Sequence, residues 1–438
     1  MVRKDGIIKI IPGERFTPFS LAKKLGALAI LESSSFVRGK ERYSLLMIRK
    51  AFSLEQRGED IFYRDETKRA KMAKGFRDIL DACEYFAGQH HPLGQDFPFP
   101  SGGIGFLSYE FARRCDKIVL PDRPDPLGLP EGSFIFGHVF VIFDHYTDLL
   151  YLIGLNYWEH EIDLERAMEE TQNKIRDMDF NYLQEDGRHY HAEILENGGR
   201  KKDFLDGVER IREEIVAGNL LQGVLSRRIT VKTDLPAVEA YRRLRSVNPS
   251  PYLFYLNFGE YELFGASPEM HLKLKDGTAF LKPIAGTRRR GSTPEEDRDL
   301  EKELLADDKE RAEHLMLVDL ARNDLGRICV PGTIKIASLM GTEKYSHVIH
   351  IVSEVRGKTV PDVGPAAAVR ATFPAGTVSG APKIRAVETM DALEPVPRSF
   401  YAGLVGYVES GGGLDSCITI RSALKKGESL ADTVLNLE

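Results

Sequence analysis

Residues 309–320 combine acidic side chains with the spacing of a helix. Glu313 is followed three, four and seven positions later by apolar residues, namely Met316, Leu317 and Leu320. Its carboxylate therefore lies on the apolar face of the predicted helix, and Glu310 lies one turn earlier on nearly the same side. Two carboxylates that face a pocket suit a hard divalent cation such as Mg²⁺. The alternative is a salt bridge from Glu313 to Arg288 or Arg322, because a buried carboxylate needs a partner.

A strand-like run at residues 345–352 carries two histidines. His347 and His350 point to opposite faces, because successive side chains of a strand alternate. Only one of them can therefore face a given pocket. An imidazole titrates near neutral pH and can take or give a proton there, but a lone strand histidine can equally be structural.

A further candidate carboxylate, Glu269, lies in the segment Gly-Ala-Ser-Pro-Glu-Met at residues 265–270. Pro268 has a fixed φ, which stiffens the approach to Glu269. A general acid must stay protonated, and an apolar setting would raise the pKa of the carboxyl group accordingly. Nearby residues that could give such a setting are Leu263, Phe264 and Met270. The alternative is an exposed carboxylate in a turn.

Small residues dominate the segment Gly-Thr-Val-Ser-Gly-Ala-Pro-Lys at 376–383. Backbone N–H groups of such a loop can approach an anion closely, and Lys383 adds a full positive charge. The segment is not a P-loop, because Pro382 precedes the lysine and Ile384 follows it. By itself the pattern fits either an anion site or a plain flexible loop.

Alternating predicted helices and strands must position these side chains. Helices are predicted at 204–217, 295–326 and 365–372, and strands at 222–231, 252–258, 345–355, 402–409 and 416–421. The strands do not follow a strict βαβ rhythm, so we expect an α+β fold in which sheets pack against helices.

The N-terminal half reads as sheet with a few helices. Residues 134–143 form an apolar strand-like run, residues 101–106 are a glycine-rich break, and residues 159–179 have a helical pattern. Residues 184–202 are mostly polar and carry three glycines, which predicts a linker. We therefore expect two parts, 1–180 and 200–438.

Composition sets the broad class. The chain has 438 residues, 42% of them hydrophobic, and a formal net charge of -6, so nothing favours nucleic acid or an anionic membrane as a partner. No signal peptide is evident, and no segment approaches the roughly 18 apolar residues of a membrane span. The cysteines are far apart, which argues against a disulfide framework or a thiolate zinc site. We expect a cytoplasmic protein.

Three segments together resemble the chorismate-utilising enzymes: residues 265–270, Pro-Ile-Ala-Gly-Thr-Arg at 283–288, and Phe-Pro-Ala-Gly-Thr-Val-Ser-Gly-Ala-Pro-Lys at 373–383. The resemblance is strong from about residue 203 to about residue 423 and weak over the N-terminal half. It implies the large two-part fold of that family, chorismate as substrate and Mg²⁺ as cofactor.

The resemblance also implies roles for the candidate residues. Glu269 matches the position of the general acid, Glu313 that of a magnesium ligand, and His350 in His-Ile-Val-Ser that of the group that transfers the proton. This favours His350 over His347. The family positions that hold the substrate correspond to Gly286, Thr287, Thr377, Lys383, Tyr401 and Arg421. An arginine can grip a carboxylate with two parallel hydrogen bonds, and chorismate carries two carboxylates.

Two positions select the nucleophile in this family. Relatives that add water carry a lysine at the position of Gln222, and glutamine cannot act as a general base. A lysine at the position of Ala285 marks aminodeoxychorismate synthase, whereas alanine marks anthranilate synthase. The resemblance thus implies the large subunit of an anthranilate synthase, which adds ammonia to C2 of chorismate and eliminates pyruvate. The alternatives are aminodeoxychorismate synthase and a catalytically impaired relative that binds chorismate or tryptophan.

Partners follow from the same resemblance. No Cys-His-Glu glutaminase unit is visible, so we expect use of free ammonia and a separate glutamine amidotransferase subunit. Two segments, residues 31–33 and 248–253, resemble the family's tryptophan-binding segments, which predicts feedback inhibition by tryptophan. The residues concerned are Ser33, Pro251, Tyr252 and Leu253. The alternative is that both segments merely shape the N-terminal sheet.

The last residues, 425–438, do not match the family pattern, which continues with a glycine-rich strand and a helix that carries a second magnesium-ligating glutamate. This predicts a truncated C-terminus, a missing strand of the core sheet with an unpaired neighbour, and impaired activity.

Overall fold

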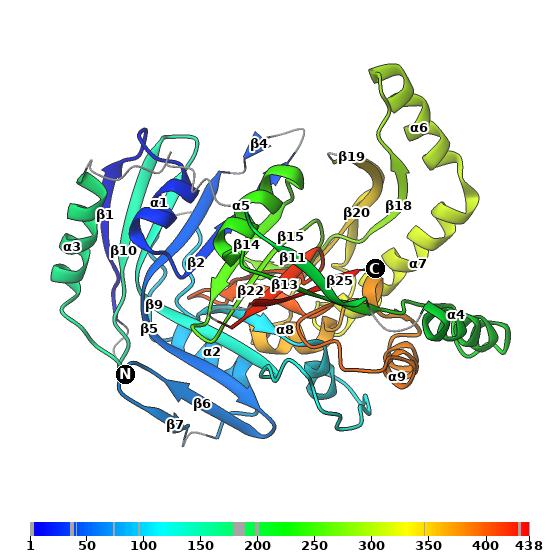
Figure 1. The fold of residues 1–438 in the computed structure, drawn as a ribbon, viewed down its shortest axis with the longest axis horizontal. Coiled ribbons are helices and arrows are strands. Elements are labelled where there is room, and N and C mark those ends of the chain that lie inside the picture. Colours follow the sequence, from blue (N-terminus) through cyan, green and yellow to red (C-terminus); the bar gives the residue numbers. More distant parts are fainter. Residues whose placement is uncertain are drawn as a thin grey trace.

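The computed structural model describes all residues except 1–3, 36–38, 41, 73–74, 95–96, 178–188, 198–200, 346, 428–430 and 438. For residues 35, 39–40, 196–197 and 431–437 only the backbone is described. Within this part of the chain, strands of both halves join in one 21-stranded sheet, and helices pack against it (Figure 1). The expected α+β class is therefore confirmed.

The N-terminal half contributes an antiparallel part of this sheet. Its strands are β1 (Ile7–Pro12), β2 (Ala29–Glu32), β5 (Tyr43–Arg57), β6 (Asp60–Arg64), β7 (Arg69–Lys71), β8 (Ile104–Leu107), β9 (Gly132–Asp144) and β10 (Leu149–Gly154). β3 (Ser34–Ser35) and β4 (Gly39–Lys40) pair only with each other. Every residue of β9 is buried, because β5, β8 and β10 pair with it and helices cover it. The strand predicted at 134–143 is confirmed as the centre of β9.

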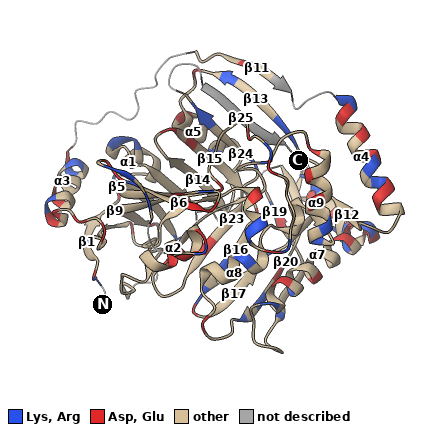
Figure 2. Ribbon diagram, turned by 90° about the horizontal axis from the view of Figure 1, so that it is seen from below, with Lys and Arg blue, Asp and Glu red and all other residues tan. Residues whose placement is uncertain are grey.

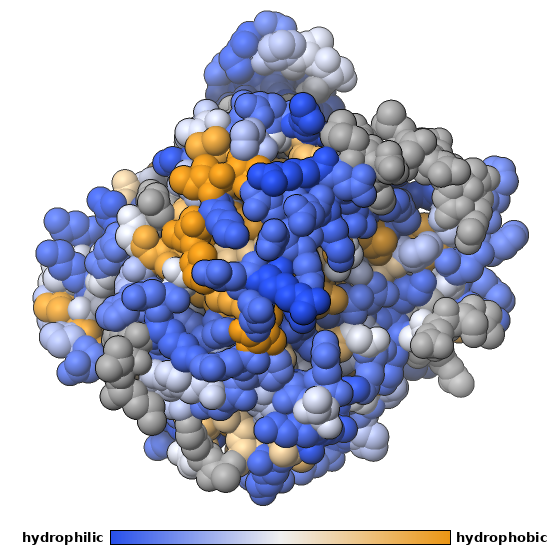
Figure 3. Space-filling model, turned by 90° about the vertical axis from the view of Figure 1, so that its left-hand side faces the viewer, coloured by the Kyte–Doolittle hydropathy of each residue, from blue (hydrophilic) through white to orange (hydrophobic). Residues whose placement is uncertain are grey.

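Helices of this half are α1 (Pro18–Leu25), α2 (Ile79–Ala87), a 3-10 turn η1 (Tyr109–Arg114) and α3 (Leu164–Arg176). The helical pattern at 159–179 corresponds to α3, which begins only after Asp163 because that side chain caps Arg166 N. Figure 3 views the side where α1, α3 and β1 lie, and hydrophobic side chains form a band across it. Ile10 of the edge strand β1 is 61% exposed.

The C-terminal half supplies the remaining strands of the sheet. They are β11 (Ala192–Asn197), β13 (Arg227–Thr233), β14 (Tyr252–Asn257), β15 (Tyr261–Ser267), β16 (Met270–Lys275), β17 (Thr278–Leu281), β18 (Ile284–Arg289), β19 (Lys335–Lys344), β20 (Val348–Lys358), β22 (Leu404–Val408), β23 (Leu414–Ile418), β24 (Ser422–Lys426) and β25 (Ala431–Leu437). β12 (Gln222–Gly223) and β21 (Gly380–Ala381) form a separate two-stranded ladder. β14 pairs with β2, and β22 pairs with β8, so backbone ladders cross between the halves. The largest apolar cluster likewise contains residues of both.

Its helices are α4 (Lys201–Val216), α5 (Ala237–Val247), α6 (Pro294–Ala306), α7 (Asp308–Gly326), α8 (Pro365–Thr372), the 3-10 turn η2 (Gly376–Val378) and α9 (Lys383–Leu393). The single helix predicted at 295–326 is divided at Asp307, whose side chain accepts hydrogen bonds from Lys309 N and Glu310 N and so begins α7. This division sets the direction in which Glu310 and Glu313 project.

The predicted linker at 184–202 is partly structured. Residues 178–188 and 198–200 lie outside the described part, but β11 pairs with β13, and α4 already begins at Lys201. The polar composition of residues 184–202 suggested a linker because β11 is an exposed edge strand and α4 is charged over most of its surface (Figure 2).

The sheet position expected to be empty near the C-terminus is filled. β25 pairs with β24 on one side and with β13 on the other, so the expectation that β24 would have an unpaired edge is wrong. The four cysteines are buried and carry free thiols. No helix among the described residues has the length and apolar composition that crossing a membrane requires.

Candidate active site

A β-bulge on β18 shapes the centre of the candidate site. Ala285 pairs with Ile351 and Thr287 with His350, so Gly286 between them has no partner across the ladder. Gly286 has a φ of 64°, and a Cβ there would lie 3.1 Å from Ile351 and 3.3 Å from Glu310 Oε2. The position therefore requires glycine on both conformational and steric grounds.

The bulge brings two polar groups to His350. Its Nδ1 lies 3.1 Å from the Gly286 carbonyl oxygen and 3.1 Å from Thr287 Oγ1. Because a carbonyl only accepts, the hydrogen bond to Gly286 assigns the proton of the neutral ring to Nδ1 and makes Nε2 the basic nitrogen. Burial lowers the pKa of His350, so the ring is neutral at physiological pH. His347 is exposed just before β20.

Glu269 and Arg421 lie near this histidine. Glu269 is 7% exposed and occupies the turn between β15 and β16. The ring of Tyr345 lies edge-on to His350 with centroids 5.3 Å apart, and the charges of Glu269 and Arg421 both act on its hydroxyl, whose pKa burial raises. Arg421 also helps to lower the pKa of His350. These four side chains therefore form one electrostatic cluster.

A small cavity extends from Glu269 to the loop of η2. Its lining includes Glu269, Lys282, Asp324 and Thr377. Thr377 Oγ1 is buried and has no hydrogen-bond partner in the described part of the chain. A buried hydroxyl without a partner is costly, which is the state expected of a group that binds a ligand.

Lys383 does not offer a free charge. Its Nζ lies 2.7 Å from Asp324 Oδ2 and 3.0 Å from the carbonyl oxygen of Thr372, and both charged side chains are nearly buried. The lysine thus ties the start of α9 to α7. Tyr401 is fully buried, and its ring centroid lies 5.9 Å from the Arg398 guanidinium.

Glu313 has an amide rather than an arginine as its neighbour. Gln222 Nε2 donates a 2.8 Å hydrogen bond to Glu313 Oε1. Within the described residues, neither Arg288 nor Arg322 pairs with Glu313, so the salt-bridge alternative is wrong. Arg322 bonds Asp319, whereas Arg288 bonds Glu303, Asp307 and Glu310.

The residues around Glu313 fit a Mg²⁺ ion that takes only one or two of its ligands from the protein. No group of three or more His, Cys, Asp or Glu side chains has a metal-binding arrangement among the described residues. Mg²⁺, however, commonly takes one or two carboxylates and completes its shell with water and substrate oxygens. Glu313 is half-buried, and a neutral amide does not cancel its charge. Glu310 is less suitable, because it forms an ion pair with Arg288 at 3.2 Å.

A second, larger cavity of about 420 Å³ contains all four residues expected to bind tryptophan. The pairing of β2 with β14 brings Ser33 beside Pro251, Tyr252 and Leu253. Tyr252 donates a hydrogen bond to Asp415, which also pairs with Lys273 at 2.9 Å. Met270 and Lys282 line both cavities.

Three residues of the site escaped sequence reasoning. Tyr345 lies against His350, Lys282 donates to Glu343 at 2.6 Å beside the cavity of Glu269, and Asp324 neutralises Lys383. For these three residues, the sequence offered one signal only, which is that Asp324 is an acidic residue on the helix that carries Glu313.

Comparison with known proteins identifies the family. A family model described as chorismate binding enzyme matches residues 39–433. Anthranilate synthase component 1 of Spirochaeta aurantia is 58% identical over 428 residues, which are 97% of this chain and 89% of that protein. The protein of the same name from Geobacillus stearothermophilus is 38% identical over 417 residues, 91% of this chain and 82% of that one.

Solved structures agree with this match. Anthranilate synthase component I of Streptococcus pneumoniae superposes with a TM-score of 0.79 at 31% identity, covering 90% of this chain and 86% of that one. The menaquinone-specific isochorismate synthase of Escherichia coli, with a TM-score of 0.72 at 17% identity over 99% and 89% of the two chains, shares the fold. The chain therefore belongs to the chorismate-binding enzyme family.

Proposed function

We propose that this protein is the large subunit of an anthranilate synthase and converts chorismate and ammonia to anthranilate and pyruvate. The contact between Gln222 and Glu313 carries the proposal. A family member that adds water needs a base at position 222, and here that position holds an amide that is already bonded to the proposed metal ligand. Ala285 offers no side-chain amine that could compete with ammonia. The names of the relatives support the same reaction.

Two side chains perform the proton transfers of this proposal. Glu269 protonates the C4 hydroxyl as it leaves, and its side chain, which is 7% exposed, lines the cavity in which that hydroxyl would lie. His350 then removes the proton in the elimination through Nε2, because Nδ1 is held by Gly286 and Thr287. Mg²⁺, when bound at Glu313, would hold the ring carboxylate and neutralise developing charge.

Substrate binding is assigned to groups around this centre. Arg421 is exposed and can grip one carboxylate, and Thr377 Oγ1 has an unused hydrogen-bonding capacity. Gly286, Thr287 and Tyr401 complete the set. Lys383 acts indirectly in this assignment, because Asp324 neutralises it and the pair fixes the loop that carries Thr377.

The nitrogen source is ammonia delivered by a partner. We propose a separate glutamine amidotransferase subunit, and a cytoplasmic location, where such a pair would meet chorismate. Purified protein alone should then use ammonium salts but not glutamine. Robust glutamine-dependent turnover by this chain alone would contradict the proposal.

Tryptophan is the proposed feedback inhibitor, bound in the cavity of Ser33, Pro251, Tyr252 and Leu253. Its aromatic lining and its mixed charges suit an amino acid with a large ring. The wall formed by Met270 and Lys282 adjoins both cavities, so an occupant of one can displace residues of the other. In this scheme residues 200–438 contribute the chemistry, and the regulatory cavity is formed by residues of both parts, 1–180 and 200–438.

One experiment tests the reaction. Chorismate, ammonium chloride and Mg²⁺ are added to purified protein, and anthranilate is followed by its fluorescence, with EDTA as the control. We expect magnesium-dependent anthranilate formation. Accumulation of a non-fluorescent aminated product would instead favour the aminodeoxychorismate alternative, and the absence of any product would favour the impaired relative.

Ala285→Lys tests how the nucleophile is selected. An amine at this position competes with ammonia, so the variant should stall or divert the reaction. An unchanged rate and product would show that Ala285 does not adjoin the reacting carbon.

A further inference from the structure

A buried guanidinium group, that of Arg398, contacts the two loops that carry Gln222 and Thr377. Arg398 is 3% exposed and follows α9. Its Nη1 donates to the carbonyl oxygen of Val378 at 2.6 Å, and its Nη2 donates to the carbonyl oxygen of Val224 at 2.6 Å. Val378 is the neighbour of Thr377, and Val224 is two residues from Gln222. One side chain therefore holds both loops.

Glu394 completes the ion pair and adds a third connection. Its carboxylate accepts hydrogen bonds from Arg398 Nε at 2.9 Å and from Nη2 at 2.6 Å. The same carboxylate accepts a hydrogen bond of 2.8 Å from Ser226 N, beyond Val224 in the same loop. Arg398 and Glu394 thus fix the backbone of this loop at two points.

The two loops also contact each other directly. Gln222 pairs with Ala381, and Gly223 pairs with Gly380, in the short ladder of β12 and β21. Gly380 has a φ of 123°, and a Cβ there would lie only 2.2 Å from the carbonyl oxygen of Gln222. A displacement of one loop must therefore displace the other.

Tyr109 of the N-terminal half packs on the other side of Arg398. The guanidinium lies 4.5 Å from the centroid of the Tyr109 ring, a distance suited to a cation–π contact. The Tyr109 hydroxyl donates a 2.9 Å hydrogen bond to Ser379 Oγ, which in turn donates to the carbonyl oxygen of Ala375. Hydrogen bonds from Arg398 and Tyr109 thus hold the loop of Thr377 at Val378 and Ser379.

Stability alone does not explain such an arrangement. Removing two charges from water is costly, and well-packed apolar residues often replace a buried ion pair without loss of stability. What apolar residues cannot do is donate directed hydrogen bonds to two particular carbonyl groups. The structural role of Arg398 is therefore to hold two backbone carbonyl groups in fixed positions.

We propose that Arg398, with Glu394 and Tyr109, is a positioning unit that fixes the loops of Gln222 and Thr377 relative to each other. Through the hydrogen bond from Gln222 it also fixes Glu313. The effect on catalysis rests on the proposed function, whereas the effect on the loops does not.

Arg398→Lys is the primary test, because it keeps the positive charge but cannot reach both carbonyl groups and Glu394 together. We expect hydrogen exchange in residues 222–226 and 376–381 to accelerate about tenfold or more. We also expect kcat/KM for chorismate to fall about 10- to 100-fold, with a higher Mg²⁺ requirement, because misplaced positioning groups cost rate. Tryptophan binding should stay within about twofold, since no residue of the unit lines that cavity.

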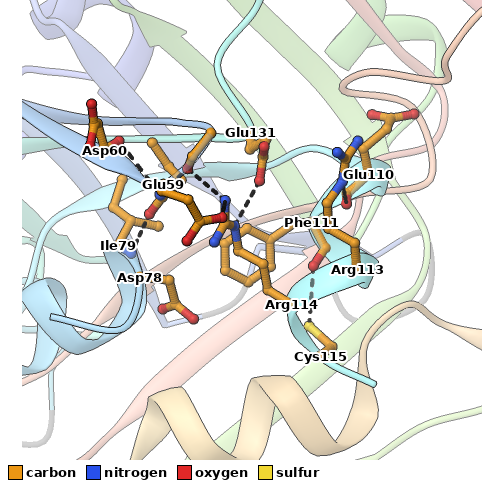
Figure 4. Close-up of polar contacts among 12 residues, drawn as sticks. Glu59, Asp60, Asp78, Ile79, Glu110, Phe111, Arg113, Arg114, Cys115 and Glu131 are labelled. Carbon is orange, nitrogen blue, oxygen red and sulfur yellow. Dashed lines mark hydrogen bonds and ion pairs between the residues drawn. The ribbon is translucent and has the colours of Figure 1, made fainter. Parts of the chain in front are cut away.

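Arg114→Lys is the matched control. Figure 4 shows Arg114 of η1 in a comparable network, in which it bonds Glu131 Oε2 at 2.8 Å and the carbonyl oxygen of Gly58 at 2.5 Å. Its side chain is 10% exposed, yet its bonds lead to the N-terminal sheet rather than to either loop. This variant should leave loop exchange and kcat/KM unchanged.

A double variant covers the case in which Arg398→Lys fails to fold. Arg398→Met combined with Glu394→Met removes both buried charges, and we expect it to fold and to show the same loosened loops. Wild-type exchange and wild-type kcat/KM in either folded variant would overturn the proposal. Loosened loops in a protein whose wild type makes no anthranilate would leave the positioning unit standing and reject the proposed function.

Discussion

The candidate active site and the candidate tryptophan cavity are built in different ways. The active-site residues all lie between Gln222 and Arg421, and hydrogen bonds join Gln222 to Glu313 and His350 to the bulge at residues 286–287. The tryptophan cavity needs both halves of the chain, because β2 and β14 must pair to form it. Met270 and Lys282 are its shared wall with the active site. Chemistry and regulation should therefore be separable by mutation except at that wall.

The largest expected effect is a loss of activity, with tryptophan binding retained, when Glu269 is changed. Glu269→Gln removes the proposed general acid, so kcat should fall about 10²- to 10⁴-fold while tryptophan binding, measured by calorimetry, is retained. Glu262→Gln on the preceding strand is the matched control, because Glu262 bonds Tyr255 rather than facing the cavity. A wild-type rate for Glu269→Gln would remove Glu269 from the chemistry.

A smaller effect is expected at Gln222. Gln222→Leu loses the hydrogen bond that orients Glu313, so the Mg²⁺ concentration for half-maximal rate should rise about 10- to 100-fold. The rate at saturating Mg²⁺ should change much less, and inhibition by tryptophan should not change. A variant with an unaltered Mg²⁺ titration would show that Glu313 needs no orientation by Gln222.

The opposite result, weaker tryptophan binding with activity retained, is expected when Ser33 is changed. Ser33→Arg places a long cation in the cavity of about 420 Å³, so the dissociation constant of tryptophan should rise at least about tenfold while kcat is retained. Ser34→Arg is the control, since Ser34 does not line the cavity. If Ser33→Arg remained fully sensitive to tryptophan, the inhibitor would have to bind elsewhere.

The smallest effect concerns pH. Burial lowers the pKa of His350, so the ring is more than half neutral at pH 6.5, where an ordinary histidine is half-protonated. At a constant concentration of unprotonated ammonia, the pH at which kcat/KM falls to half its maximum should therefore lie below 6.5. The same shift means that stability is lost as pH falls below the unfolded pKa, because the unfolded chain then binds the proton first. A half-maximal rate near pH 6.5 would contradict the burial argument.

Sequence reasoning identified the catalytic candidates because each lies in a short motif. The segment around Glu269, the strand of His350 and the helix of Glu313 were all recognisable locally. It could not reveal the bulge at Gly286, which depends on pairing with β20, or the ion pair that neutralises Lys383, whose partner lies on another helix. Arg398 carried no local signal at all, since its role arises from contacts with two distant loops.

The ladders between the halves also govern how the chain can acquire its fold. Ile104 of β8 pairs with Tyr407 of β22, and Ala29 of β2 pairs with Leu256 of β14. During synthesis both N-terminal strands must wait for partners that emerge much later, with one edge of each open to other chains. We therefore expect slow folding that ends only after β22 has left the ribosome, with aggregation of the nascent chain as the competing outcome.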